Sequence, residues 1–283
     1  MLELKNNTEK YKLSSKELNI EILKSGDIFK IYKNDIQINL FKGNLLDGAI
    51  NNIYLRRKKG NTYNYSKLIG VDSPSSFLVL EDKVVYKGET FGINYQVILK
   101  LLNNIWYYNV KLDKGTNDDL FDIIFVQDIG VAPSGMIQSS EAYTGQYVDH
   151  NVFSNENKTT ILFRQNQGVP NLVQIGSFNN ITSYATDGFQ FYGLTYKETN
   201  IPESLLKEKL VSQNYQYEFP LAALQTEPFK LDSSKEFTFY GMYVENYEEI
   251  RKEPFEINNI TFDNEVSGKY LKFENKIEIG TPL

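Results

Sequence analysis

The stretch GINYQVILKLLNNIWYYNVKL, residues 92–112, decides the fold. It contains two runs rich in Ile, Val, Leu and Tyr, 92–102 and 105–112, on either side of Asn103-Asn104. Asparagine tolerates the positive φ that a tight two-residue turn requires, and both runs have the length of a strand. The stretch therefore predicts an antiparallel β-hairpin.

The same alternation of apolar runs and turn residues continues along most of the chain. Further strands are expected at 19–24, 28–33, 36–40, 76–80, 83–87, 120–131, 158–163, 172–178, 181–185, 188–192 and 236–244. More than about a dozen strands would make too wide a single sheet, so they are expected to fold into two packed layers. The sequence thus predicts an all-β fold, a large two-layer antiparallel β-sandwich. It is expected to form a single domain over residues 1–283, with frayed or linker-like ends at about 1–15 and 255–283.

One short segment, NIPESLLKEKLV at residues 200–211, is expected to be helical. Pro202 stands near the first helical position, and Leu205, Leu206 and Leu210 form one apolar stripe. The segment is too short to be a core helix, so we expect it to act as a flap or to cover a sheet edge.

The composition narrows the class of protein. Of the 283 residues, 41% are hydrophobic and 14% aromatic, which is enough for a large core. Lys and Arg number 30 against 36 Asp and Glu, and no basic block is present, which argues against a nucleic-acid partner. No run approaches the roughly 18 apolar residues of a membrane span, and the polar start MLELKNNTEKYKL is unlike a signal peptide, so we expect a cytoplasmic protein with no membrane partner. The absence of cysteine excludes disulfides, thiolate nucleophiles and cysteine-based zinc sites.

Polar side chains concentrate in residues 127–151 and again in 164–168 and 212–217. Long polar loops between strands often carry binding sites. Amide, carboxyl and phenol groups can pair with sugar hydroxyls, while an aromatic ring packs against the C–H face of a sugar. The candidate sugar-binding residues are Gln127, Asp128, Gln146, Tyr147, Asp149, His150, Arg164, Gln165 and Gln167. The alternative interpretation is that these residues close turns and satisfy backbone groups in a loop-rich sandwich.

The sequence assigns no catalytic residue and no metal site. His150 is the single histidine and stands beside Asp149, but adjacent residues on a strand point to opposite faces, so the two could share a site only in a loop. Without a ligand, His150 would be a structural hydrogen-bonding residue. No spacing among the carboxylates selects an acid–base pair. Neither a Gly-x-Ser-x-Gly elbow nor a phosphate-binding glycine loop is present.

Five longer strings give the chain a family resemblance. They are Leu-Ile-Gly-Val-Asp-Ser-Pro-Ser-Ser (68–76), Gly-Ile-Asn-Tyr-Gln-Val (92–97), Phe-Val-Gln-Asp-Ile-Gly-Val-Ala-Pro (125–133), Ala-Tyr-Thr-Gly-Gln-Tyr-Val-Asp-His (142–150) and Pro-Leu-Ala-Ala-Leu-Gln-Thr-Glu-Pro-Phe (220–229). In these strings the chain resembles the N-terminal region of the 1,2-β-oligoglucan phosphorylases, relatives of cellobiose phosphorylase. The similarity extends through most of residues 60–250.

The resemblance implies a β-supersandwich domain of the galactose mutarotase-like kind, which in these phosphorylases precedes an (α/α)6 barrel. In that family the general acid is an aspartate of the barrel, and inorganic phosphate is the co-substrate that attacks the anomeric carbon and releases glucose 1-phosphate. This sequence has no run of helices that could form a barrel, so neither the general acid nor the phosphate-holding residues can be assigned here. We therefore expect a carbohydrate-site-flanking domain that is not catalytically complete alone, has no cofactor, and works with a helical catalytic domain in cis or in trans.

Two other functions stay open at this point. A free-standing carbohydrate-binding module would present an exposed aromatic platform, for which Trp106, Tyr107 and Tyr108 are available. A mutarotase-like sugar enzyme would share the supersandwich fold and would need His150 as its acid. A domain that docks on helical neighbours should instead expose a large apolar patch.

Overall fold

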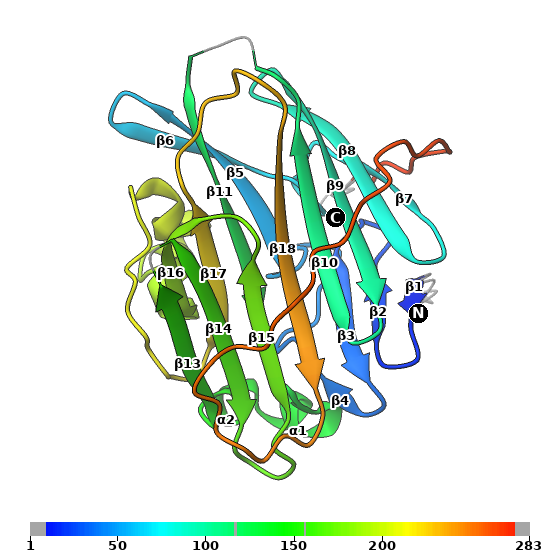
Figure 1. Cartoon of the computed structure of the whole chain (residues 1–283), viewed down its shortest axis with the longest axis vertical. Helices are drawn as coiled ribbons and strands as arrows, with labels where there is room; N and C mark the ends of the chain where they lie inside the picture. Colours follow the sequence, from blue (N-terminus) through cyan, green and yellow to red (C-terminus); the bar gives the residue numbers. More distant parts are fainter. Residues whose placement is uncertain (1–9, 116–117, 156, 275–283) are drawn as a thin grey trace, which may run out of the picture.

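The computed structural model describes residues 10–115, 118–155 and 157–274. Its strands form three antiparallel sheets in two layers (Figure 1). In spatial order, the eight-stranded sheet contains β13 (Val148–Asn155), β14 (Lys158–Gln165), β15 (Leu172–Ser177), β18 (Lys235–Val244), β10 (Ile105–Leu112), β9 (Ile93–Leu102), β8 (Lys83–Thr90) and β7 (Ser76–Val79). The prediction of a two-layer antiparallel sandwich is confirmed.

The second layer consists of two five-stranded sheets that lie side by side behind the eight-stranded sheet in Figure 1. One contains β16 (Ile181–Asp187), β17 (Pro220–Thr226), β11 (Leu120–Asp128), β5 (Asn52–Lys59) and β6 (Thr62–Lys67). The other contains β1 (Tyr11–Ser14), β2 (Asn19–Ile22), β3 (Ile28–Lys33), β4 (Ile36–Gln37) and β12 (Ala132–Pro133). The sequence did not predict β1, β5, β6, β12, β13 or β17.

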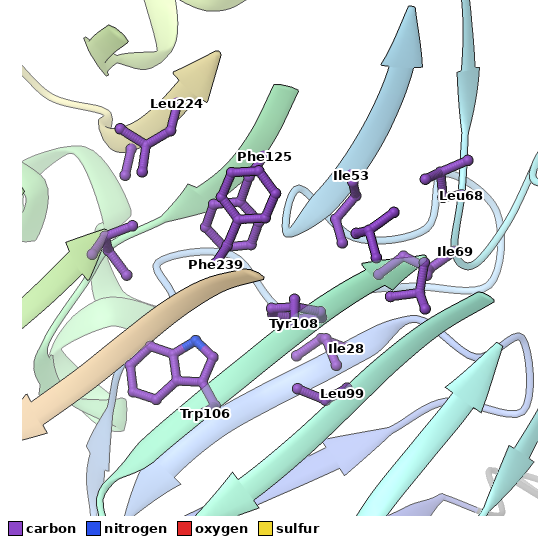
Figure 2. Close-up of a cluster of buried hydrophobic side chains, with 14 of the residues drawn as sticks. Ile28, Ile53, Leu68, Ile69, Leu99, Trp106, Tyr108, Phe125, Leu224 and Phe239 are labelled. Carbon is purple, nitrogen blue, oxygen red and sulfur yellow. The ribbon is translucent and has the colours of Figure 1, made fainter. Parts of the chain in front are cut away.

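The predicted hairpin forms as β9 and β10, which lie near the middle of the eight-stranded sheet. Leu102 pairs with Ile105 across the turn, and Asn103 has a φ of 55°. Trp106 on β10 lies opposite Gly241 on β18, and its indole occupies the space that a side chain at position 241 would need. Figure 2 shows Trp106 near Phe125 and Phe239, whose rings stack at 5.1 Å between centroids. Trp106, Tyr107 and Tyr108 are all buried, so they form no exposed aromatic platform.

A second apolar cluster lies on the outer face of the sheet of β5 and β11. It contains Tyr54, Ile124, Val126 and Leu221, and it is covered by side chains of residues 191–210. The covering segment includes α3 (Gly188–Tyr192), α4 (Tyr196–Thr199) and the 3-10 helix η1 (Glu203–Leu206). Two more short helices, α1 (Ser134–Ser139) and α2 (Glu141–Gly145), lie within the polar segment that follows β11.

The strand expected at 188–192 is wrong, because these residues form α3. The side chain of Asp187 accepts a hydrogen bond from the Phe189 amide, and the side chain of Gln190 accepts one from the Asp187 amide. This reciprocal capping box starts a helix and overrides the strand-like spacing of the aromatic residues.

The helix expected over 200–211 is also wrong in length, since only the single 3-10 turn of η1 forms there. Arg56 on β5 donates hydrogen bonds to the carbonyl oxygens of Ser204, Leu205, Lys207 and Glu208, which a longer helix would use internally. The segment covers the outer face of the sheet, and the expected apolar stripe is incomplete, since Leu205 and Leu210 are buried but Leu206 is exposed.

Residues 245–274 run as an extended strap over the outer face of the eight-stranded sheet (Figure 1). The Phe255 amide donates to Gln174, the Phe262 ring contacts Tyr107, and Leu271 pairs with Phe77. Among the helices that the structure describes, none has the length and apolar character needed to cross a bilayer.

Candidate functional site

The nine residues expected to bind sugar do not gather in one site. Gln127 and Gln165 are fully buried and act inside the sandwich. Gln127 accepts a 2.9 Å hydrogen bond from the Trp106 indole, and Gln165 donates to the carbonyl oxygens of Gly130 and Thr144. These two amides satisfy internal groups, as the alternative interpretation of the sequence described.

Asp149 and His150 lie on β13, so they point to opposite faces of the sheet. Asp149 accepts a 2.9 Å hydrogen bond from Gln216, while the imidazole of His150 packs edge-on against Phe163. His150 Nδ1 lies 2.7 Å from the Tyr215 carbonyl oxygen, which requires the proton to be on Nδ1. Burial lowers the pKa of His150 to about 4. The imidazole is therefore neutral at neutral pH, which is the wrong state for a general acid.

Three of the remaining candidates surround an exposed ring near α2. Tyr147 packs edge-on against Tyr143, and Gln167 donates to the Tyr143 hydroxyl at 3.3 Å. Gln146 caps the end of α2 and is exposed. Tyr147 and Gln167 are half-buried, and none of the three candidates lines the four cavities of about 770, 480, 60 and 260 Å³ in the described residues.

Arg164 lies on the outer face of β14 and lines a cavity of about 260 Å³ together with two other candidates, Asp149 and His150. Its guanidinium donates to the carbonyl oxygens of Tyr247 and Glu248. These hydrogen bonds fasten the start of the strap to the sheet, so the arginine has a structural role.

Asp128 is buried at the end of β11, and its carboxylate accepts a 2.6 Å hydrogen bond from the Phe41 amide. Burial raises the pKa of Asp128 to about 6. Hydrogen bonds from the amides of Phe41, Asp128 and Leu40 act in the opposite direction and lower this pKa, but burial has the larger effect. Asp128 therefore fixes the position of Phe41, and Phe41 is part of the wall of a much larger cleft.

The pKa of Asp128 gives a testable pH dependence. Between the ordinary aspartate pKa and about 6, the folded chain holds a proton that the unfolded chain has lost, so stability falls as pH rises through this range. The loss from this group amounts to about 3 kcal/mol. In urea unfolding from pH 4 to 7, the free energy of unfolding of Asp128→Asn should decline less with rising pH than that of the parent chain. Parallel profiles for the two proteins would contradict this role, because the other buried carboxylates are common to both.

A concave site of about 770 Å³ lies on the outer face of the sheet of β5 and β6. We call it the tyrosine cleft, after four tyrosines that line it: Tyr54, Tyr65, Tyr192 and Tyr196. Its other walls come from residues 41–50, from Ser66, Lys67 and Asp72, and from Asn200 and Pro202. This volume lies within the range of about 300–1,000 Å³ that is typical of ligand sites.

Regular elements hold the four rings. Tyr54 on β5 and Tyr65 on β6 meet edge-on at 6.1 Å between centroids, and α3 and α4 carry Tyr192 and Tyr196, whose centroids lie 4.6 Å apart. Burial raises the pKa of all four phenols. The hydroxyls therefore remain protonated at neutral pH and can both donate and accept hydrogen bonds.

A second buried carboxylate fixes the opposite wall. Asp27 accepts hydrogen bonds from the amides of Ala49 and Val71 and from the Ser25 hydroxyl, at 3.0, 2.8 and 2.7 Å. At Gly70, which has a φ of 75°, the Asp27 carboxylate occupies the space that a side chain would need. Asp27 thereby joins the loops around positions 48 and 71, which border the cleft.

The lining favours a neutral polar ligand. Its charged side chains are two lysines, Lys42 and Lys67, and two aspartates, Asp47 and Asp72, so its formal charge is balanced. Over the ranges 10–115, 118–155 and 157–274, no group of three or more acidic or histidine side chains could hold a metal ion. Phenol rings and hydroxyls beside amide and carboxyl groups match the needs of a sugar.

Sequence reasoning missed this cleft because its residues come from four separate segments. Of the candidates that the sequence provided, Asp128 is connected to it, through Phe41. The available signal was the frequency of tyrosine, with 20 in the chain, but frequency does not indicate which rings meet.

The comparisons with known proteins agree with the fold. The chain matches the family model described as the SOGP N-terminal domain over residues 21–241. It is 32% identical over 274 residues to a 1,2-beta-oligoglucan phosphorylase of Listeria innocua serovar 6a, covering 94% of this chain and 24% of that protein. The chain thus spans about a quarter of the length of this relative.

Two solved structures match the chain at low sequence identity. A protein of Escherichia coli K12 described as an aldose 1-epimerase has a TM-score of 0.51 at 7% identity, over 84% of this chain and 100% of that one. A galactose mutarotase related enzyme of Lactobacillus acidophilus gives a TM-score of 0.42 at 9% identity, and the match covers 86% of this chain and 100% of that one. The first likeness supports the mutarotase-like fold. Because the family model matches residues 21–241, which is most of this chain, the chain belongs to the SOGP N-terminal domain family.

Proposed function

We propose that this chain is the N-terminal, carbohydrate-site-flanking domain of a glycoside phosphorylase that acts on β-1,2-linked gluco-oligosaccharides. The observation that carries the proposal is the 32% identity, which extends along 94% of this chain but over only 24% of a 1,2-beta-oligoglucan phosphorylase. Phosphorolysis then depends on a helical catalytic domain, in cis or in trans, that supplies the general acid and holds inorganic phosphate.

The placement of the ionisable groups supports a role without independent catalysis. His150 is turned into the sandwich and Asp128 binds backbone amides, so these two perturbed groups serve the fold. The mutarotase alternative has the fold likeness in its favour, but its acid would have to be the neutral, buried His150.

The distribution of exposed apolar side chains supports docking on another domain. Among the described residues, thirteen large hydrophobic side chains are exposed, and six of these lie between positions 189 and 217. They are Phe189, Leu194, Leu206, Val211, Tyr215 and Tyr217. Phe189 and Tyr217 pack edge-on at 5.9 Å between centroids, and a contiguous exposed apolar surface of this kind is typical of an interaction site.

A chimera tests the proposal. The matched quarter of the Listeria phosphorylase is replaced by this chain, and release of glucose 1-phosphate from β-1,2-gluco-oligosaccharides and phosphate is measured. We expect turnover by the chimera and none by this chain alone. A folded but inactive chimera would contradict the phosphorylase role, and turnover by the isolated chain would contradict the need for a second domain. The intact Listeria enzyme is the positive control.

A further inference from the structure

We propose that the tyrosine cleft is itself a carbohydrate-binding site, which takes a segment of a β-1,2-linked gluco-oligosaccharide without help from a catalytic domain. The choice of this sugar rests on the proposed function, whereas the cleft and its chemistry rest on the side chains that line it.

The hydroxyl groups of the cleft are the first argument. Within the described part of the chain, none of the phenol oxygens of Tyr54, Tyr65, Tyr192 and Tyr196 makes a hydrogen bond to another residue. Tyr54 is only 3% exposed as a residue, and its hydroxyl is not among the buried side-chain atoms that lack a partner, so the exposed part of this side chain includes the oxygen. Buried polar groups are normally satisfied, and a group that is left open in a cavity wall can be satisfied by a ligand.

The charges of the cleft exclude most other classes of small ligand. A phosphate or nucleotide site needs an excess of cationic groups or a phosphate-binding loop at a helix start. Here Asp47 and Asp72 balance Lys42 and Lys67, and the nearest helices, α3 and α4, have five and four residues. A purely apolar ligand would leave the phenol hydroxyls unsatisfied. A neutral polyol satisfies them and presents C–H faces to the rings.

The rigidity of the cleft is the third argument. Tyr54 and Tyr65 lie on paired strands, with Tyr54 opposite Lys67 and Tyr65 opposite Arg56. Asp27 and Asp128 hold the loops of the far wall through hydrogen bonds to backbone amides. Side chains on rigid elements lose little conformational freedom on binding. Only a small part of the binding free energy is therefore lost to ordering these side chains.

The test uses isothermal titration and NMR chemical-shift changes with β-1,2-gluco-oligosaccharides. We expect binding of the parent chain at concentrations up to about the millimolar range, and a loss of about tenfold or more in Tyr65→Ala and Tyr196→Ala. Tyr196→Phe keeps the ring and removes the hydroxyl, so it should lose part of that affinity. Inorganic phosphate, added as an anionic probe, should not compete.

The matched control is Tyr143→Ala, since Tyr143 is 47% exposed and lies in the other candidate region near α2. It should bind like the parent chain, and unchanged melting temperatures should accompany all four substitutions. Absence of binding by the parent chain, equal binding by the cleft variants, or a loss confined to Tyr143→Ala would each overturn the proposal. The chimera distinguishes the two proposals. If the chimera is active but this chain does not bind sugar in the cleft, only the proposed cleft site is contradicted. If the cleft binds sugar but the chimera is inactive, only the proposed phosphorylase role is contradicted.

Discussion

Replacing Arg56 with alanine is expected to lower the free energy of unfolding by about 3–5 kcal/mol. Its side chain is completely buried and forms a two-pronged ion pair with Asp122, at 2.7 and 2.8 Å. The same guanidinium binds the carbonyl oxygens of residues 204, 205, 207 and 208. Alanine would therefore leave a buried carboxylate and several carbonyl groups unsatisfied at once.

Urea unfolding measures this effect, with Lys58→Ala as the matched control. Lys58 points to the same face of β5 two residues further on, and its contact with Glu208 is a surface ion pair of 3.7 Å. The control should lose much less stability than Arg56→Ala, because the ion pair of Lys58 is exposed to solvent. The double variant Arg56→Met with Asp122→Leu should recover only part of the loss, because the carbonyl groups stay unpaired. Full recovery would mean that the carbonyl contacts contribute nothing.

Replacing Trp106 with alanine should cost a similar amount, about 3–5 kcal/mol, because it leaves a large cavity in the centre of the core. The indole lies against the backbone of Gly241, which has no side chain to fill the space. Urea unfolding again measures the loss, and far-UV circular dichroism should confirm that the strands persist.

A double-mutant cycle separates the packing of Trp106 from its hydrogen bond. Trp106→Phe keeps most of the ring volume but leaves the buried Gln127 side chain without its donor, at a cost of about 1–3 kcal/mol. Adding Gln127→Leu removes the unsatisfied group, so the double variant should be more stable than Trp106→Phe alone. If the second change lowered stability further, Gln127 would have partners other than Trp106.

The sequence predicts those elements of the fold whose signal is local. The hairpin of β9 and β10 is an example, because its apolar runs and its Asn-Asn turn lie within 21 consecutive residues. The helix α3 also had a local signal, the capping pair Asp187 and Gln190, but the aromatic spacing of residues 188–192 obscured it. In both cases the decisive groups lie close together along the chain.

The parts of the fold and of the cleft that the sequence does not predict depend on groups that are far apart along the chain. The segment 200–211 has a helical pattern, yet its carbonyl groups bind Arg56, about 150 residues earlier. The tyrosine cleft likewise joins β5 and β6 to α3 and α4. No hydrophobic periodicity or short motif in the sequence indicates which of these distant residues will contact each other. Amide-rich loops, in contrast, look like binding sites in the sequence although Gln127 and Gln165 serve internal hydrogen bonds.

The strap over the eight-stranded sheet also affects association between molecules. The Phe77 amide donates to the Leu271 carbonyl oxygen at 2.8 Å, and the Leu271 amide donates back at 2.7 Å, on the outermost strand β7. An uncovered edge strand offers its unpaired backbone groups to any extended segment of a neighbouring molecule. By occupying the backbone groups of Phe77, the strap removes one pairing site from this edge of the sheet.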